Sequence, residues 1–163
     1  MQPLNQQGMF LETILNITHE KFKNDNECLV IKIPTNWIVT KANDHSFLRH
    51  EACDYIGNYQ GFYFEFEAKE TYKDYFDWKM IRTNQLIKMN QIIQNQGITF
   101  LIIYFGKYDA FYYVDYLLLK KWVEANQQHI AHEWFEINAQ QINLNSQLKL
   151  DYLNCLDKAI LKK

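Results

Sequence analysis

Residues 54–69 read DYIGNYQGFYFEFEAK, and this stretch predicts a tight β-hairpin around which the rest of the chain is organised. Its second half alternates, so the apolar side chains at positions 62, 64, 66 and 68 are expected on one strand face. The other face would carry Tyr63, Glu65, Glu67 and Lys69. We therefore expect a half-buried strand with one charged face. Glu67, with Asp54 upstream across the turn, makes that face a candidate site for a hard cation, which prefers oxygen ligands.

The composition fits one folded domain covering residues 1–163, because a chain of this length can bury a real core. A hydrophobic content of 48%, with 16% aromatic residues, excludes the disordered class. The three cysteines are far apart and form no CxxC pair, which favours a reducing compartment over a disulfide framework or a zinc site. The apolar run at 98–105 is too short to cross a bilayer, and the first residues lack a signal-peptide pattern. We expect a soluble, cytoplasmic protein.

The net charge of −2 does not by itself indicate DNA binding, since phosphate neutralisation is the main term in DNA affinity. It does not exclude DNA binding either. An acidic metal site lowers the net count, and local patches matter more than totals.

Outward from the hairpin, hydrophobic spacing predicts the remaining elements. Helices are expected over residues 8–24, 79–96, 116–125 and 148–161, strands over 27–34, 37–40, 98–105 and 110–114, and a loop over 138–147. Residues 71–77 are polar and aromatic and are assigned to no element. This order predicts an α/β domain with a mixed central sheet flanked by helices.

Several side chains outside the hairpin allow both a structural and a functional interpretation. Glu12 is either an exposed carboxylate near a helix amino end or a group that points at the metal site. Gln85, at the edge of an apolar helical stripe, is either an interfacial polar residue or a donor or acceptor aimed at Glu67. His129 and His132 could share a helix face, but no Cys or third His accompanies them, so metal binding there is not favoured.

The segment between the first strands and Asp54 contains Lys41, Arg49 and His50 but no clear periodicity. It is either a solvated loop or a basic protrusion that meets DNA phosphates. Residues 35–53 are thus a possible DNA-contacting protrusion, and the family resemblance described below implies a short stalk there.

Longer sequence words are more specific than the spacing alone. They are GMFLET at 8–13, CDYIGNYQG at 53–61, FEFEAKET at 64–71, NQLIKMNQIIQNQGITFLIIYF at 84–105 and LDYLNCLDK at 150–158. Asp54, twelve intervening residues and then Glu67-Ala68-Lys69 is similar to the PD-(D/E)XK nuclease signature. In this order the words resemble the RecU-type Holliday junction resolvases of Gram-positive bacteria and mollicutes.

The resemblance implies a restriction-endonuclease-like core and a homodimeric endonuclease that makes paired nicks in four-way DNA junctions during recombination and repair. It implies Mg²⁺ as cofactor, with Mn²⁺ as a substitute. Asp54 and Glu67 fall on the catalytic metal-binding positions, Gln85 on a metal-associated glutamine, and Lys69 on the transition-state lysine. Ala52 stands where the family has a metal-associated Thr. Supporting roles would fall to Glu12, within GMFLET, and to Glu65.

Three hypotheses remain at this stage. The first is a junction-resolving endonuclease. The second is a branched-DNA-binding protein of the same fold with weak or lost cleavage, which Ala52 and the low basicity would permit. The third is a related nuclease that acts on linear duplex. A purely structural alternative treats Glu67 and Lys69 as a surface ion pair, typically worth less than about 1 kcal/mol.

Overall fold

The hairpin forms around a two-residue turn in the computed structural model, which describes residues 9–34 and 52–163. Strand β2 (Tyr55–Tyr59) pairs antiparallel with β3 (Phe62–Thr71). Gln60 and Gly61, between them, both have positive φ, at 53° and 87°. Positive φ at both central residues is the mark of the type I′ turn, whose twist matches that of the flanking strands.

The register of this hairpin brings the two carboxylates of the expected site together. Tyr59 lies opposite Phe62, and Tyr55 lies opposite Phe66. Asp54, one residue before β2, therefore lies beside Glu67. The twelve-residue separation between these carboxylates is thus the spacing that a hairpin centred on Gln60 and Gly61 requires.

Strand β3 lies inside a six-stranded mixed sheet of order β1-β2-β3-β5-β6-β8. The other strands are β1 (Leu29–Lys32), β5 (Ile98–Phe105), β6 (Ala110–Asp115) and β8 (Gln140–Ile142). The β3–β5 pair is parallel, and the other neighbouring pairs are antiparallel. A separate two-stranded sheet joins β4 (Tyr75–Asp77) to β7 (His129–Ala131).

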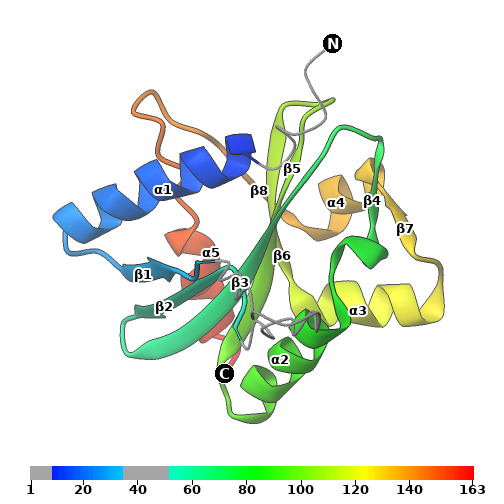
Figure 1. Cartoon of the computed structure of the whole chain (residues 1–163), viewed down its shortest axis with the longest axis horizontal. Coiled ribbons are helices and arrows are strands. Elements are labelled where there is room, and N and C mark those ends of the chain that lie inside the picture. The colour runs from blue at the N-terminus through cyan, green and yellow to red at the C-terminus, as the bar shows by residue number, and fades with distance from the viewer. Residues whose placement is uncertain (1–8, 35–51) are drawn as a thin grey trace, which may run out of the picture.

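Helices cover both faces of the large sheet (Figure 1). On one face lie α1 (Met9–Asn24) and α5 (Leu153–Ile160), packed on a core that includes Leu15, Phe66 and Leu156. On the other lie α2 (Thr83–Gln94), α3 (Tyr116–Ala125) and α4 (His132–Asn138), packed on Leu101 and its neighbours. A mixed sheet between helical layers confirms the predicted fold class. None of the helices within the described ranges has the length and apolar character that a bilayer crossing needs.

The expectation that β3 is half-buried is wrong. Glu65 and Glu67, on its charged face, are both fully buried, with 0% of their surface exposed. The reason is that α2 lies over this face, where its Gln85 meets Glu67 and its Lys88 meets Glu65. The candidate site therefore has a buried carboxylate, Glu67, between the partly exposed Asp54 and Lys69.

Several element boundaries also differ from expectation. The helix predicted over 79–96 is a 3₁₀ turn (Trp78–Met80) followed by α2, because Ile81 and Arg82 are extended. The helix predicted over 148–161 begins only at Leu153, since Leu150 forms a β-bridge with Leu144. Residues 138–147, predicted to be a loop, contain β8, and residues 71–77, which were assigned to no element, contain β4. The histidines at 129 and 132 lie in β7 and at the start of α4, so they do not share a helix face. The strand predicted over 37–40 lies outside the described residues.

Candidate active site

Asp54 is held at the entrance to β2 by two hydrogen bonds to neighbouring strands. Its Oδ2 accepts from the backbone N–H of Ala68 at 3.1 Å. Its backbone carbonyl accepts from the N–H of Ile33 at 2.8 Å. One bond reaches β3 and the other lies at the end of β1, so the carboxylate is fixed against the strand that carries Glu67.

Glu67 has one satisfied oxygen and one unsatisfied oxygen. Its Oε2 accepts from Gln85 Nε2 at 2.7 Å and lies 3.1 Å from Lys69 Nζ. Its Oε1 is buried and has no hydrogen-bond partner. Burial, followed by the charge of Asp54, raises the pKa of Glu67 to about 8, against the opposing effect of Lys69. Two adjacent carboxylates and an orphaned oxygen form a site of excess negative potential.

Gln85 links this pair to the start of α2. Its Oε1 accepts from the backbone N–H of Arg82 at 2.9 Å and from Lys69 Nζ at 3.5 Å. Because a carbonyl oxygen must face the Arg82 N–H, the amide group faces Glu67 and donates to it. Gln85 thus orients Glu67, and its role as a metal ligand stays a prediction.

The position of Gln85 on α2 could not be read from the apolar spacing. The sequence suggested the edge of a stripe, whereas Gln85 is buried on the same face as Met89 and Ile92. Ile87, which the spacing added to the stripe, is exposed. A polar residue therefore occupies a central place on the buried face, where it meets β3.

The residues fit a divalent cation of the Mg²⁺ type. Glu67 Oε1 has no hydrogen-bond donor, and the charge of Asp54 lies close to the Glu67 carboxylate. Within the part of the chain that the structure describes, no three His, Cys, Asp or Glu side chains form a metal-binding group. Mg²⁺ is commonly bound through one or two carboxylates, with water and substrate phosphate completing its coordination. Asp54 and Glu67 match that donor set.

Glu12 does not enter this cluster but lies near Asp54. It forms an ion pair with Lys32, and its side chain is about half exposed. Both residues line a pocket of about 340 Å³ together with Asp54 and Glu70. This pocket opens beside the first turn of α1.

Glu70 is a buried residue of this region that sequence reasoning missed. Its Oε2 accepts from the N–H of Leu11 at 2.9 Å, and its Oε1 accepts from the Tyr72 hydroxyl at 2.8 Å. A carboxylate on the free N–H groups of a helix amino end is favourable, so Glu70 caps α1. The alternation of residues 62–70 could have revealed it, since this alternation places Glu70, a carboxylate, on the otherwise apolar face opposite Glu67.

The other predicted site residues are placed as follows. Glu65 is buried on the face of β3 that carries Glu67. Ala52 lies just before Cys53 and Asp54, and its side chain offers no oxygen. The predicted DNA-contacting residues Lys41, Arg49 and His50 lie outside the described residues.

Comparison with known proteins agrees with this fold. The family model described as "RecU: Recombination protein U" matches residues 6–158. This chain belongs to the RecU family. The match includes every residue of the cluster around Glu67.

Curated relatives support the same family. A protein of Oceanobacillus iheyensis named Holliday junction resolvase RecU is 30% identical over 94% of this chain and 86% of its own length. A protein of the same name from Ureaplasma parvum, a mollicute, is 31% identical over 79% of each chain. Among solved structures, Archaeoglobus fulgidus Hjc, described as a Holliday junction resolvase, aligns with a TM-score of 0.51. It covers 80% of this chain and 93% of its own at 9% identity, so it supports the fold alone.

Proposed function

We propose that this chain is a Mg²⁺-dependent endonuclease that resolves four-way DNA junctions by paired, symmetric nicks during recombination and repair. The observation that carries the proposal is the cluster of Asp54, Glu67 and Lys69, in which Glu67 is fully buried and its Oε1 lacks a partner. Membership of a family whose relatives are named Holliday junction resolvases supports the choice of substrate. Mn²⁺ would serve in place of Mg²⁺, and the cytoplasm, where bacterial chromosomal DNA lies, is the proposed place of action.

Each residue of the cluster has a role in this chemistry. Asp54 and Glu67 would hold the cation, which when bound supplies charge neutralisation and an activated water at the phosphodiester. Gln85 keeps Glu67 in position through its 2.7 Å hydrogen bond. Lys69, only 14% exposed, presents its Nζ beside Glu67, where it orients the attacking water or offsets charge that develops on the phosphate.

Two symmetric nicks require two equivalent sites, so we propose a homodimer with two-fold symmetry. Each protomer would supply one complete cluster, because Asp54, Glu67, Lys69 and Gln85 all come from a single chain. Junction DNA would then contact both protomers at once.

A second candidate is a junction-binding protein of the same fold with weak or lost cleavage. The observation that favours it is Ala52, which provides no side-chain oxygen where the resemblance expects a metal-associated Thr. In this case the acidic cluster would bind the cation too weakly for efficient hydrolysis.

Cleavage of a synthetic four-way junction separates these functions. Wild-type protein is compared with the D54A and K69A variants in Mg²⁺, with Mn²⁺ and EDTA as parallel conditions and linear duplex of the same sequence as a control substrate. We expect symmetric nicks on opposite strands from the wild type alone, with activity at least about 100-fold lower in each variant, which is the size of effect seen when a group that stabilises the transition state is removed. Nicking that survives both substitutions would sink the assignment. Tight junction binding without nicking in either metal would favour the second candidate.

A further inference from the structure

Glu65 is a fully buried carboxylate that the proposed chemistry does not use. It lies two residues before Glu67 on the same face of β3 and is 0% exposed. A buried charge is costly unless it is paired and hydrogen-bonded. Its partners therefore indicate what the fold gains from keeping it.

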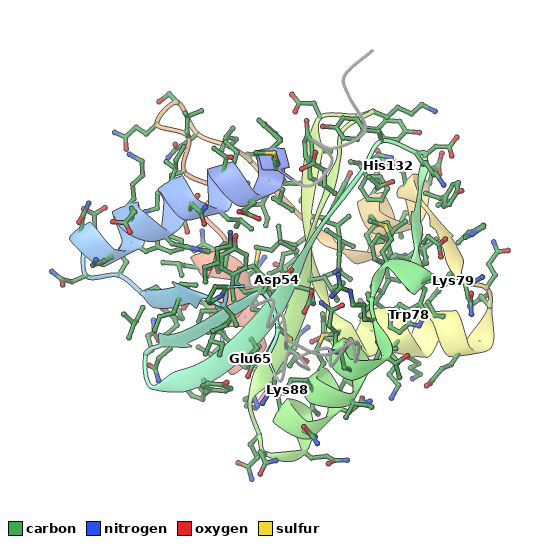
Figure 2. All side chains as sticks on the ribbon, in the orientation of Figure 1. Asp54, Glu65, Trp78, Lys79, Lys88 and His132 are labelled. Carbon is green, nitrogen blue, oxygen red and sulfur yellow. The ribbon has the colours of Figure 1, made fainter. Side chains whose placement is uncertain are left out.

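Both oxygens of Glu65 have partners, which distinguishes it from Glu67. Its Oε2 accepts from the backbone N–H of Cys53 at 2.9 Å. Its Oε1 accepts from the Tyr63 hydroxyl and lies 3.8 Å from Lys88 Nζ on α2 (Figure 2). The contact with Cys53 is the one that reaches towards the candidate active site.

Cys53 immediately precedes Asp54, and the ladder between β2 and β3 begins only at Tyr55. Asp54 is thus just outside the regular sheet, where its position depends on individual hydrogen bonds. The side-chain carboxylate and the backbone carbonyl of Asp54 accept the hydrogen bonds from Ala68 and Ile33 described above. On its amino side, Glu65 holds the Cys53 N–H against β3, the strand that carries Glu67.

We propose that Glu65 is a positioning residue, which fixes the Cys53 backbone so that the Asp54 carboxylate is held beside Glu67. This inference rests on the proposed function, since it concerns the metal site of the nuclease. Without Glu65 the Cys53 N–H, in a residue that is 1% exposed, would be buried and unpaired, and the segment would shift to find another partner.

The test uses a matched set of variants of the full chain. E65M keeps approximately the volume of the side chain but removes the acceptor, whereas E65Q keeps an acceptor oxygen for Cys53 and removes the charge. Y63F removes the other hydrogen bond of Glu65 and leaves the Cys53 bond in place. Mn²⁺ affinity is measured by calorimetry without DNA, and exchange of the Cys53 amide proton is measured by NMR without metal.

We expect E65M to bind Mn²⁺ about 10- to 100-fold more weakly than the wild type, as for other residues that orient metal ligands. E65Q and Y63F should retain close to wild-type affinity. The Cys53 amide should exchange slowly in the wild type, E65Q and Y63F, and faster in E65M. Wild-type affinity in E65M would overturn the proposal. Equal weakening in E65Q and E65M would do so too, because it would show that Glu65 acts through its charge.

These measurements separate the positioning role from the proposed function. If wild-type protein binds Mn²⁺ but does not nick the junction, the nuclease proposal fails while the comparison of variants still tests Glu65. If E65M does not fold, the exchange rate of the Cys53 amide proton in the wild-type protein still tests the proposal. A Cys53 amide in the wild-type protein that exchanges as fast as an exposed amide would overturn the proposal regardless of the variants.

Discussion

Glu67 combines full burial with an adjacent carboxylate, an arrangement that stability alone would not favour. Lys69 and Gln85 both contact Oε2, and Oε1 has no donor. Buried polar atoms without partners cost about 1–3 kcal/mol each. Such a cost is expected where a cation is to be bound, because the same groups that repel each other attract the metal.

Replacing Glu67 by Gln should therefore raise stability and abolish cleavage. The Gln amide can donate towards Asp54, while its oxygen still accepts from Lys69 or Gln85. We expect the free energy of unfolding to increase by about 1–2 kcal/mol at pH 7 in metal-free buffer. Because the folded-state pKa of Glu67 is raised above its unfolded value, the contribution of Glu67 to stability falls as pH rises from about 4.5 to about 8. The gain in E67Q should grow over this range.

Urea unfolding at several pH values measures this effect, and Glu70→Gln is the matched control. Both oxygens of Glu70 accept hydrogen bonds, one of them from the first turn of α1. Its replacement should lower stability or leave it unchanged. A loss of stability in E67Q as large as that in E70Q would contradict our interpretation of the orphaned oxygen.

The sequence was sufficient to predict which residues of the candidate site lie together, but not their surroundings. Asp54, Glu67 and Lys69 follow from strand alternation and from a spacing that a hairpin imposes. That Glu67 is buried, and that Gln85 donates to it, depends on how α2 packs over β3. This packing joins segments whose contact no local pattern encodes.

At the scale of elements, the sequence predicted those helices and strands whose pattern lies within one segment. It did not predict the strands that depend on pairing with a distant segment. The hairpin, β5 and α3 were predicted because their alternation, apolar run or helical spacing is contained within each segment. Strands β4 and β8 are three residues each, and each exists because it pairs with a distant strand, β7 and β6 respectively. Segments this short carry too little pattern of their own to be recognised.

His19 on α1 joins the first helix to the last part of the chain. Its Nε2 lies 2.9 Å from the Tyr152 hydroxyl, and its ring meets those of Tyr55 and Tyr152 edge-on. Burial lowers the pKa of His19 to about 3. The imidazole is therefore neutral in the folded protein across the physiological range.

Acid should weaken this packing before the carboxylates titrate. Since the folded-state pKa lies below the unfolded value of about 6.5, the unfolded chain takes up the extra proton first. The contribution of His19 to stability is complete above about pH 6.5 and is lost as pH falls towards 3. Between pH 6.5 and pH 5 we expect a loss approaching about 1.4 kcal/mol per pH unit.

Chemical denaturation at pH 7 and pH 5 checks this expectation. Between these pH values the free energy of unfolding of the wild type should fall relative to that of the H19F variant. His129→Gln serves as the control, because the His129 side chain is 55% exposed. An equal pH dependence in wild type and H19F would show that His19 does not govern the acid sensitivity.

At the scale of the whole molecule, one face of the large sheet forms the aromatic core and the other face carries the candidate active site. The face under α1 and α5 is an aromatic core, in which Phe66 stacks on Tyr55 and on Phe100 at 4.8 and 4.7 Å between ring centroids. The face under α2 carries two buried acidic residues of β3, Glu65 and Glu67. A rigid apolar layer behind the strand supports the geometry of the acidic cluster in front of it.

Strand β3 contributes to both faces, because its side chains point alternately to the core and to the candidate active site. Phe64 and Phe66 hold the strand in the core, while Glu65 and Glu67 point to the opposite side. A shift of one residue in the register of β2 and β3 would reverse these faces. The type I′ turn at Gln60 and Gly61 is therefore as important to the site as the acidic residues themselves.

The most direct test of the central claim is a crystal structure of the protein grown with Mn²⁺, in which anomalous scattering locates the metal. We predict a Mn²⁺ peak between the carboxylates of Asp54 and Glu67, at coordination distances similar to the roughly 2.1 Å of Mg²⁺. The E67Q variant, crystallised under the same conditions, should lack it. Wild-type crystals with no peak at this pair, or with Mn²⁺ bound only elsewhere, would contradict the account.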